Sequence, residues 1–260
     1  MDTTDPNVES ARYPATGRFL AGRLRHAMSE AEKGLLEAMV ERTEWIDKPT
    51  RLIARGADCS RSTMLIEGFM LRTLDGEGRR HAVSFHVPGD FVDLHAYALT
   101  RLDHNIDTVG RVKVGYVPHA ALDAVMRDQP HLARLFWFST LLDAAMHREW
   151  IMTMEQLTTP RRIAHIFAEI WRRLEMVGLA RPDGFETPLT QADVAEMCGA
   201  TPIHTNRAIR ELRQNGTAVF DRGRVTIPDQ PALEGYAGFI PDYLYGPWAL
   251  GYNPQPGDPI

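Results

Sequence analysis

Residues 200–215 combine arginines with other hydrogen-bond donors at a spacing that suits a helix. In a helix that starts at Pro202, one face can pack inward through Thr205, Ala208, Ile209 and Leu212. The opposite face then carries mostly cations and donors, which are Ile203, His204, Asn206, Arg207, Arg210 and Arg213. Such a face favours phosphate as its partner. We therefore predict that it contacts double-stranded DNA.

Two short helices joined by a tight turn must position this face. Thr190 and Asp193 have the spacing of a capping box, and Thr201 followed by Pro202 is a typical start of a second helix. Gly199 lies between them and can adopt the positive φ that a tight turn requires. The stretch therefore predicts a helix-turn-helix unit.

A β-hairpin is predicted directly after these helices. Residues 217–227 contain two short β-prone runs around Asp221-Arg222-Gly223-Arg224, which places arginines at the hairpin tip. Between residues 200 and 226 there are five arginines and only two carboxylates. The hairpin and the local positive charge strengthen the DNA hypothesis. Two alternatives stay open: an ordinary helical hairpin with a solvated basic face, or a module that docks on an acidic protein.

Composition limits the classes of protein to consider. The chain has 260 residues, enough for two domains, and its net charge of −5 indicates that any DNA contact is a local patch. Its two cysteines, Cys59 and Cys198, are too few for a four-thiolate iron–sulfur cluster or a thiolate zinc site. No signal peptide and no apolar run of about 18 residues is present, so we expect a cytoplasmic protein.

The first half of the chain has the pattern of a small β-domain. Residues 1–17 are polar and proline-containing, which predicts a flexible leader, and residues 20–45 have helical spacing. Between residues 48 and 117, short β-prone runs alternate with turn residues. This texture predicts a small antiparallel barrel or jelly roll, which can enclose a ligand.

A long helix is predicted from residue 130 to residue 157. Its apolar residues follow steps of three and four, a pattern typical of a dimer seam, and the seam includes Leu135, Ser139, Leu142, Met146, Trp150 and Leu157. The alternative is that the helix packs on its own domain. Thr158-Thr159-Pro160 should break the helix and form a hinge before another helix at residues 161–177. The proline-rich residues 228–260 should be extended beyond a short helix near residues 232–236.

This order of elements resembles the CRP/FNR family (cyclic-AMP receptor protein and fumarate-nitrate regulator) of bacterial transcription regulators. The resemblance rests on Gly89-Asp90-Phe91, Thr108-Val109, Pro160-Arg161-Arg162-Ile163-Ala164 and the run LTQADVAEMCGATPIHTNRAIRELRQNG. It implies an α+β fold with an N-terminal antiparallel β-roll of the cyclic-nucleotide-binding type, a long dimerisation helix and a C-terminal winged helix-turn-helix. It also implies a homodimer, with DNA and RNA polymerase as partners.

The resemblance divides the chain into segments. They are a leader at residues 1–17, the β-roll with flanking helices at 18–130, the dimerisation helix at 131–157, the DNA-binding domain at 158–227 and a Pro-rich tail at 228–260. In the family, the second helix of the helix-turn-helix enters the major groove. Arg207 matches a base-contacting position and can donate to guanine O6 and N7, His204 can donate to a base, and Ile203 can contact a thymine methyl. Thr190, Thr201 and Arg222 are expected at phosphates.

The expected nucleotide-binding residues depart from the family pattern. Asp93-Leu94 stands where nucleotide-binding members have Gly-Glu, and His104-Asn105 stands near the position of their Arg-Ser pair. A cyclic phosphate would lack its guanidinium partner unless Arg101 or Arg111 moved in. We therefore expect no cyclic-AMP binding and leave the effector open. No cysteine precedes Cys59, so the cluster of the oxygen-sensing branch is not expected either.

A cupin-like metalloenzyme is the competing class of function, because several histidines lie in or just after the β-prone stretch: His81, His86, His95, His104 and His119. Cupin sites use two histidines one residue apart, and this chain has no His-x-His pair. We accordingly predict no metal site and no cofactor, with haem ligation as a weaker alternative. No nucleophile turn or phosphate-binding glycine loop is present, so we predict no enzymatic activity.

Overall fold

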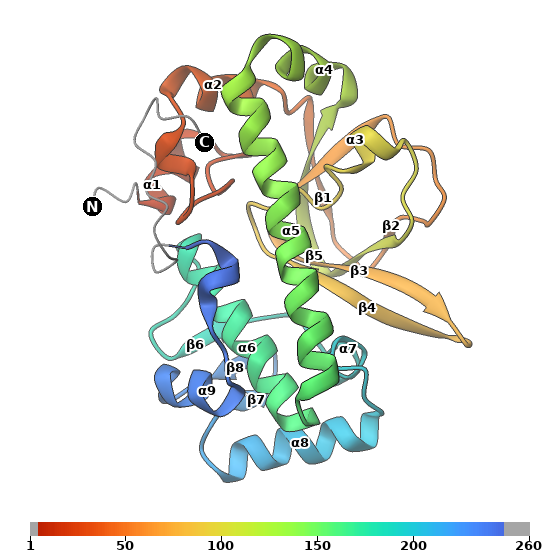
Figure 1. Ribbon diagram of the computed structural model, residues 1–260, viewed down its shortest axis with the longest axis vertical. Coiled ribbons are helices and arrows are strands. Elements are labelled where there is room, and N and C mark those ends of the chain that lie inside the picture. Colours follow the sequence, from red (N-terminus) through yellow and green to blue (C-terminus); the bar gives the residue numbers. More distant parts are fainter. Residues whose placement is uncertain (1–4, 247–260) are drawn as a thin grey trace.

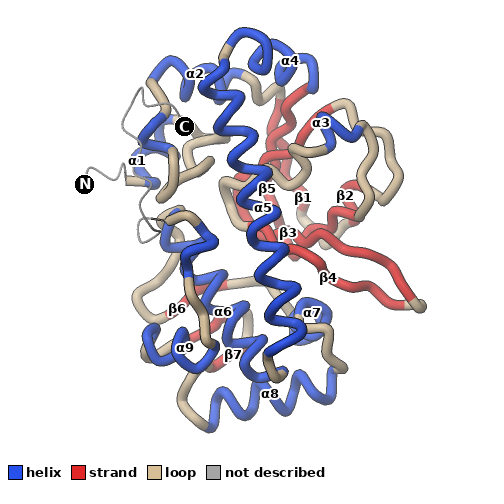
Figure 2. Tube along the Cα trace, viewed as in Figure 1, coloured by secondary structure: helices blue, strands red, loops and turns tan. Residues whose placement is uncertain are grey.

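The computed structural model describes residues 5–246 and has an antiparallel sheet beside one long helix, with a smaller helical domain at the far end (Figures 1 and 2). The strands are β1 (Arg42–Ile46), β2 (Arg51–Ile53), β3 (Arg61–Gly76), β4 (Arg79–His86) and β5 (Asn105–Pro118). Their order is β1-β5-β3-β4, and β2 also pairs with β5. The short helix α3 (Ala96–Leu99) lies between β4 and β5. We call residues 42–118 the β-domain.

The long strand β3 bends because its pairing with β5 shifts register on both sides of Glu67. Gly68 lies in this bend with a φ of +88°, and a Cβ there would lie 2.5 Å from the Arg111 carbonyl oxygen. Only glycine fits such a close approach of two backbones. All of these strand pairs are antiparallel, which confirms the predicted class of β-domain.

The N-terminal segment is ordered from α1 (Pro6–Arg12) onward, so the prediction of a flexible leader is wrong for residues 6–17. Glu9 of α1 is buried, and its carboxylate contacts Arg25 Nε at 2.8 Å and Lys33 Nζ at 3.1 Å. These two cations lie in the short helix η1 (Arg25–Ala27) and in α2 (Glu30–Ala38). The polar composition therefore reflects a buried ion-pair cluster that fixes the segment on the protein.

The prediction of helical structure for residues 20–45 is also wrong at its C-terminal end. Helix α2 stops at Ala38, and the backbone N–H of Glu41 already donates to the Tyr116 carbonyl of β5. The following residues pair with β5 as β1, in which Trp45 lies opposite Lys113. Pairing with the neighbouring strand thus overrides the local helical pattern.

Helix α4 (His119–Asp128) leads into α5 (Pro130–Gln156), which runs along the β-domain to the C-terminal domain (Figure 1). The predicted seam needs a correction, because Leu135, Leu142 and Met146 are buried within this chain. Leu135 belongs to the same buried apolar cluster as Phe19 and Phe91, while the other two belong to the cluster that includes α6. The other members of the predicted seam, Ser139, Trp150 and Leu157, are half-buried.

A different stripe of α5 faces outward. Trp137 is 65% exposed and Ile151 is 69% exposed, and Leu141 and Met152 are also exposed. The members of this stripe follow residues of the predicted seam by one or two positions, so the stripe lies on a different face of the helix. The face of α5 that the periodicity predicted would contact a second copy instead packs on the core of the same chain.

The C-terminal domain is built around α6 (Thr159–Met176), in which 12 of the 18 residues are buried. Around it lie β6 (Gly184–Glu186), α7 (Gln191–Met197), α8 (Pro202–Gln214), β7 (Val219–Asp221), β8 (Arg224–Thr226), α9 (Gln230–Ala237) and η2 (Pro241–Leu244). The predicted break before α6 is confirmed, since Leu157 and Thr158 have extended backbones. The connection between α6 and α7 contains β6, which pairs with β8.

The described part of the proline-rich end contains two short helices, α9 and η2, so it is less extended than predicted. Helix α9 matches the short helix predicted near residues 232–236, and Arg161 Nε donates to the Tyr236 carbonyl at 3.0 Å. The following η2 is held by Arg23 Nε, which donates to the Leu244 carbonyl at 2.7 Å. The remainder of the predicted tail, including Trp248, lies outside the described residues. Within residues 5–246, no helix combines the length and apolar character that crossing a membrane needs.

Candidate DNA-binding interface

The turn between α7 and α8 is held by side-chain caps at both helix starts. Thr190 Oγ1 accepts from the Asp193 N–H at 3.2 Å, and Asp193 Oδ2 accepts from the Thr190 N–H at 2.9 Å, which completes the predicted capping box. Thr201 Oγ1 accepts from the His204 N–H at 3.3 Å. Gly199 has a φ of +59° in the turn. The caps fix where α8 begins, and therefore which of its side chains point outward.

The two faces of α8 are divided as the sequence predicted. Its buried residues are Thr205, Ala208, Ile209 and Leu212. The exposed ones include every predicted contact on this helix: Ile203, His204, Asn206, Arg207, Arg210 and Arg213. In Figure 1, α8 lies along the lower edge of the molecule, at the end farthest from α2 and α4. A second macromolecule can approach α8 without displacing another described element.

The arginines of this face are not used inside the protein. Within residues 5–246, the side chains of Arg207, Arg210 and Arg213 form no hydrogen bond or ion pair. Glu211, the acidic residue of α8, instead accepts from the Tyr236 hydroxyl at 3.0 Å. The guanidinium groups therefore keep all of their donors for a ligand, and arginine can donate to phosphate or to guanine in a bidentate manner.

The predicted hairpin is formed by β7 and β8 and extended by β6 into a three-stranded sheet. At its tip Arg222 has a φ of +47° and Gly223 a φ of +76°, the pair of positive φ values that a tight two-residue hairpin turn requires. The Arg222 side chain is 93% exposed. Arg224, by contrast, contacts Asp183 at 2.6 Å and so is less available than its neighbour.

An ion-pair contact between the β-domain and α7, which we call the Arg80 clamp, was not predicted from the sequence. Arg80 of β4 contacts Asp193 Oδ1 through Nη2 and Glu196 Oε2 through Nε, each at 2.7 Å. Asp193 thus caps α7 and also holds Arg80. The partners lie more than a hundred residues apart, so local spacing could not reveal them.

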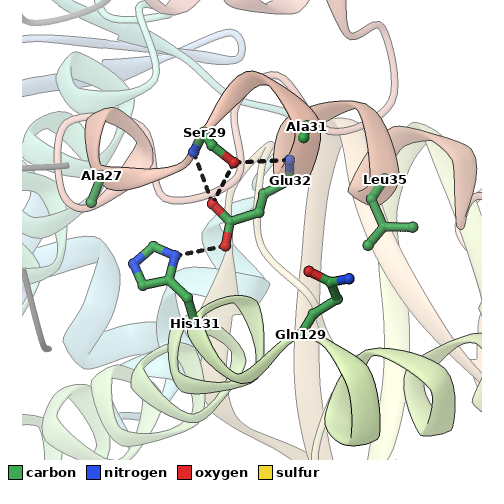
Figure 3. A pocket seen from close by; sticks show the side chains of 7 residues that line it. All are labelled: Ala27, Ser29, Ala31, Glu32, Leu35, Gln129 and His131. Atoms are coloured by element: carbon green, nitrogen blue, oxygen red, sulfur yellow. Dashed lines mark hydrogen bonds and ion pairs between the residues drawn. The ribbon is translucent and has the colours of Figure 1, made fainter. Parts of the chain in front are cut away.

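A pocket of about 590 Å³ lies elsewhere, between α2 and the start of α5 (Figure 3). Glu32 dominates its polar lining and accepts from the Ser29 N–H and Oγ, while His131 Nδ1 lies 2.7 Å from the other Glu32 oxygen. This carboxylate is already bonded on both oxygens by groups of the chain itself. The pocket is therefore not a candidate for the DNA site.

Comparisons with known proteins agree with this geometry. The model of the Crp-like helix-turn-helix domain matches residues 161–236. A Rhizobium leguminosarum bv. viciae protein named "Probable transcriptional activator" is 26% identical over 84% of this chain and 86% of its own length. FnrL of Cereibacter sphaeroides, a transcriptional activator protein, is 29% identical over 62% of this chain and 66% of its own.

The solved structures agree at the level of the fold. FixK2 from Bradyrhizobium japonicum superposes with a TM-score of 0.68 at 19% identity, over 75% of this chain and 96% of its own. A CRP/FNR regulator from Thermus thermophilus superposes at 0.59 with 18% identity, over 76% of this chain and 98% of its own. The chain is therefore a DNA-binding transcription regulator that carries a Crp-like helix-turn-helix domain at residues 161–236 and shares the fold of solved CRP/FNR regulators.

Proposed function

We propose that this protein acts as a homodimer and recognises a two-fold-symmetric DNA sequence through α8 of each copy. The observation that carries the proposal is the outward face of α8, where Arg207, Arg210 and Arg213 are exposed and unpaired within the described part of the chain. A helix fits the major groove of B-form DNA, where each base pair presents a distinct set of donors and acceptors.

Individual residues of α8 suit different parts of the duplex. Arg207 lies in the second turn of the helix and can donate to guanine O6 and N7, whereas Ile203, 65% exposed, can pack on a thymine methyl. His204 and Asn206 add exposed groups that can hydrogen-bond base edges. Thr190 and Thr201 lie at helix starts and Arg222 at a hairpin tip, positions that suit phosphate contacts and so fix register.

The outward stripe of α5 supports the homodimer. Trp137, Leu141, Ile151 and Met152 expose large apolar side chains along one helix, and an exposed apolar surface of this kind marks an interface. A second copy can cover it with the same stripe, as a two-fold interface requires. Two copies of α8 about 34 Å apart would then reach successive major grooves.

Direct contacts connect the β-domain to the DNA-binding domain. Arg80 contacts Asp193 and Glu196 of α7, and Arg173 of α6 contacts Asp90 at 2.5 Å. A change in the β-domain would therefore shift α7 and α6 together. We propose that such changes, with the bend at residues 157–158, set the separation of the two α8 helices in the dimer.

The effector is not expected to be cyclic AMP. Arg101 is held by Asp58 at 2.6 Å, and Arg111 is held by Asp47 at 3.0 Å and stacks over Trp45. The buried Arg72 is paired with Asp143 and donates to the Val92 carbonyl. A cyclic phosphate would have to displace one of these partners to obtain a guanidinium ion.

The role of a transcription regulator also favours a protein without enzymatic activity. Because relatives are named activators, we extend the proposal to RNA polymerase as a partner at promoters.

Selection of bound duplexes from a random pool with the purified protein tests the proposed function. We expect enrichment of one motif with two inverted half-sites about 10 base pairs apart. Binding to that motif should weaken steeply with salt and still exceed binding to a scrambled duplex, because phosphate contacts give affinity and base contacts give preference. No enriched motif, or enrichment of an asymmetric one, would contradict the proposal.

The dimer needs a separate measurement. Ile151→Asp places a charge in the outward stripe of α5, whereas Leu179→Asp places one on an exposed apolar residue of the C-terminal domain. Sedimentation analysis should give a dimer for the wild type and for Leu179→Asp, and a shift towards monomer for Ile151→Asp. If both variants remain dimeric, the second copy does not use this stripe.

A further inference from the structure

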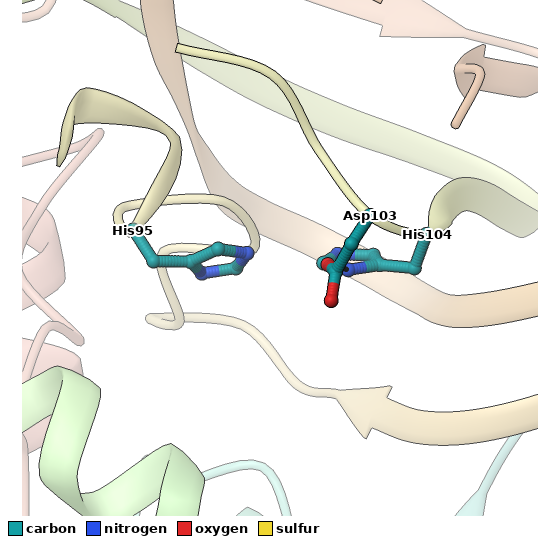
Figure 4. Close-up of side chains that lie close together, drawn as sticks. All are labelled: His95, Asp103 and His104. Carbon is teal, nitrogen blue, oxygen red and sulfur yellow. Dashed lines mark hydrogen bonds and ion pairs between the residues drawn. The ribbon is translucent and has the colours of Figure 1, made fainter. Parts of the chain in front are cut away.

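Three possible metal ligands meet in the β-domain, between α3 and the start of β5 (Figure 4). His95 is the N-cap residue of α3, and Asp103 and His104 lie in the turn that leads into β5. One ligand atom from each residue can be chosen so that all three lie within 4.8 Å of one another. The two imidazole rings point toward each other, tilted by 41°, with centroids 5.2 Å apart.

The His95 ring and one nitrogen of His104 lack a hydrogen-bond partner among the described residues. His104 Nδ1 lies 2.7 Å from Asp103 Oδ1, while His104 Nε2 is buried and has no hydrogen-bond partner among the described residues. No hydrogen bond of the His95 ring is found in residues 5–246 either. A buried imidazole nitrogen without a partner is costly, and a bound ion would remove that cost.

The protonation state also suits a metal. Burial, with the nearby Arg72 charge, lowers the pKa of His95 to about 3 and also lowers the pKa of His104. Both rings are then neutral at pH 7, which is the form that binds a metal ion. Arg72 opposes a cation here, but its charge is balanced by the ion pair with Asp143. Asp103 supplies a further negative charge at the site itself.

We propose that His95, Asp103 and His104 bind one divalent transition-metal ion, with water completing its coordination. Two imidazoles and one carboxylate are a ligand set that Zn²⁺ and Fe²⁺ accept. The ligand atoms must approach to roughly 2.0–2.2 Å from the ion. The Asp103 side chain, 81% exposed, can rotate towards the ion and leaves it a path from solvent.

The expectation of no metal site rested on the absence of a His-x-His pair. His95 and His104 lie nine residues apart, and it is the short helix α3 and the following turn that bring them together. The proposal concerns the β-domain and does not depend on DNA binding.

Zinc binding by the full-length protein without a histidine tag tests the site. Isothermal titration with Zn²⁺ in the presence of a competing chelator should give one ion per chain. His95→Ala and His104→Ala should each lower the affinity at least ~10-fold, the loss that follows even from changing a group behind a ligand. His81→Ala changes a half-buried histidine of β4 outside the cluster and serves as the matched control, with unchanged affinity.

Asp103→Asn provides a second variant with little effect on folding, because Asp103 is exposed. It should bind Zn²⁺ more weakly than the wild type and keep the same thermal unfolding curve without metal. Co²⁺ bound by the wild type should give visible absorption bands that decrease in all three cluster variants. No Zn²⁺ bound by the wild type, or equal affinity in the wild type and the Asp103→Asn and His104→Ala variants, would overturn the proposal.

Discussion

Helices α6 and α8 both carry arginines, but the protein uses them in opposite ways. On α6, Arg173 is 2% exposed and contacts Asp90 and Glu169, and Arg172 contacts Glu234 at 2.6 Å. On α8, Arg207, Arg210 and Arg213 are exposed and lack such partners within residues 5–246. Arg173 joins the C-terminal domain to the β-domain and Arg172 joins α6 to α9, whereas the α8 arginines remain free for a partner outside the chain.

The largest effect is expected on the free energy of unfolding when a buried arginine of α6 is removed. Arg173→Ala leaves Asp90 and Glu169 without their cation. Burial opposes ionisation of Asp90, but the Arg173 charge, followed by the interaction with His86, outweighs it and holds the pKa of Asp90 at about 2. Removing one partner of a buried ion pair costs about 3–5 kcal/mol, so we expect a loss of that size in the free energy of unfolding by urea.

Arg213→Ala is the matched control, since it removes an exposed arginine from α8. Its free energy of unfolding should stay within about 0.5 kcal/mol of the wild type. Equal destabilisation by the two substitutions would remove the distinction between the helices.

Arg207→Ala should affect DNA binding and leave stability unchanged. We expect a loss of ~1–3 kcal/mol in binding to the selected duplex, with relaxed preference at one base pair in each half-site. Fluorescence anisotropy with the selected duplex and with single-base variants measures both quantities. A uniform loss on every duplex would show that Arg207 contacts phosphate and not a base.

Thr201→Ala tests the cap that fixes the start of α8. The hydroxyl that accepts from the His204 N–H is lost, which should lower the free energy of unfolding by about 1 kcal/mol. Thr201→Ser keeps the hydroxyl and is the control, with stability close to the wild type. Equal stability of the alanine and serine variants would mean that the cap does not stabilise α8.

Arg222→Ala should have the smallest effect. Its side chain lies at an exposed hairpin tip, so its loss should weaken binding to all DNA sequences to a similar degree. The slope of log K against the logarithm of the salt concentration should become smaller by about one. Titrations at several salt concentrations measure that slope. A change in base preference would place Arg222 in a groove and would contradict the phosphate assignment.

The sequence was most informative where the relevant contacts are local. The division of α8 into two faces, the two caps and the hairpin tip follow from residues close together in the chain, and the structure agrees with each. Periodicity also located α5 and its end. Periodicity could not show whether this face of α5 packs on the chain's own core or on a second copy, because Leu142 and Met146 have the same spacing in both cases.

What the sequence did not reveal depends on distant contacts. The ordered N-terminal segment depends on Glu9 meeting Arg25 and Lys33, and the clamp of Arg80 on α7 joins residues over a hundred positions apart. The pair of His95 and His104 forms only when α3 and the next turn fold. In each case polar residues that resemble a solvated surface in the sequence are buried or paired in three dimensions.

Methylation interference on the selected duplex tests the central claim most directly. Methyl groups on guanine N7 block contacts in the major groove, where α8 is proposed to lie. We predict two blocks of interference, one in each half-site and about 10 base pairs apart, and loss of one guanine from each block with Arg207→Ala. A single block, or binding that tolerates every N7 methyl group, would contradict recognition by paired α8 helices.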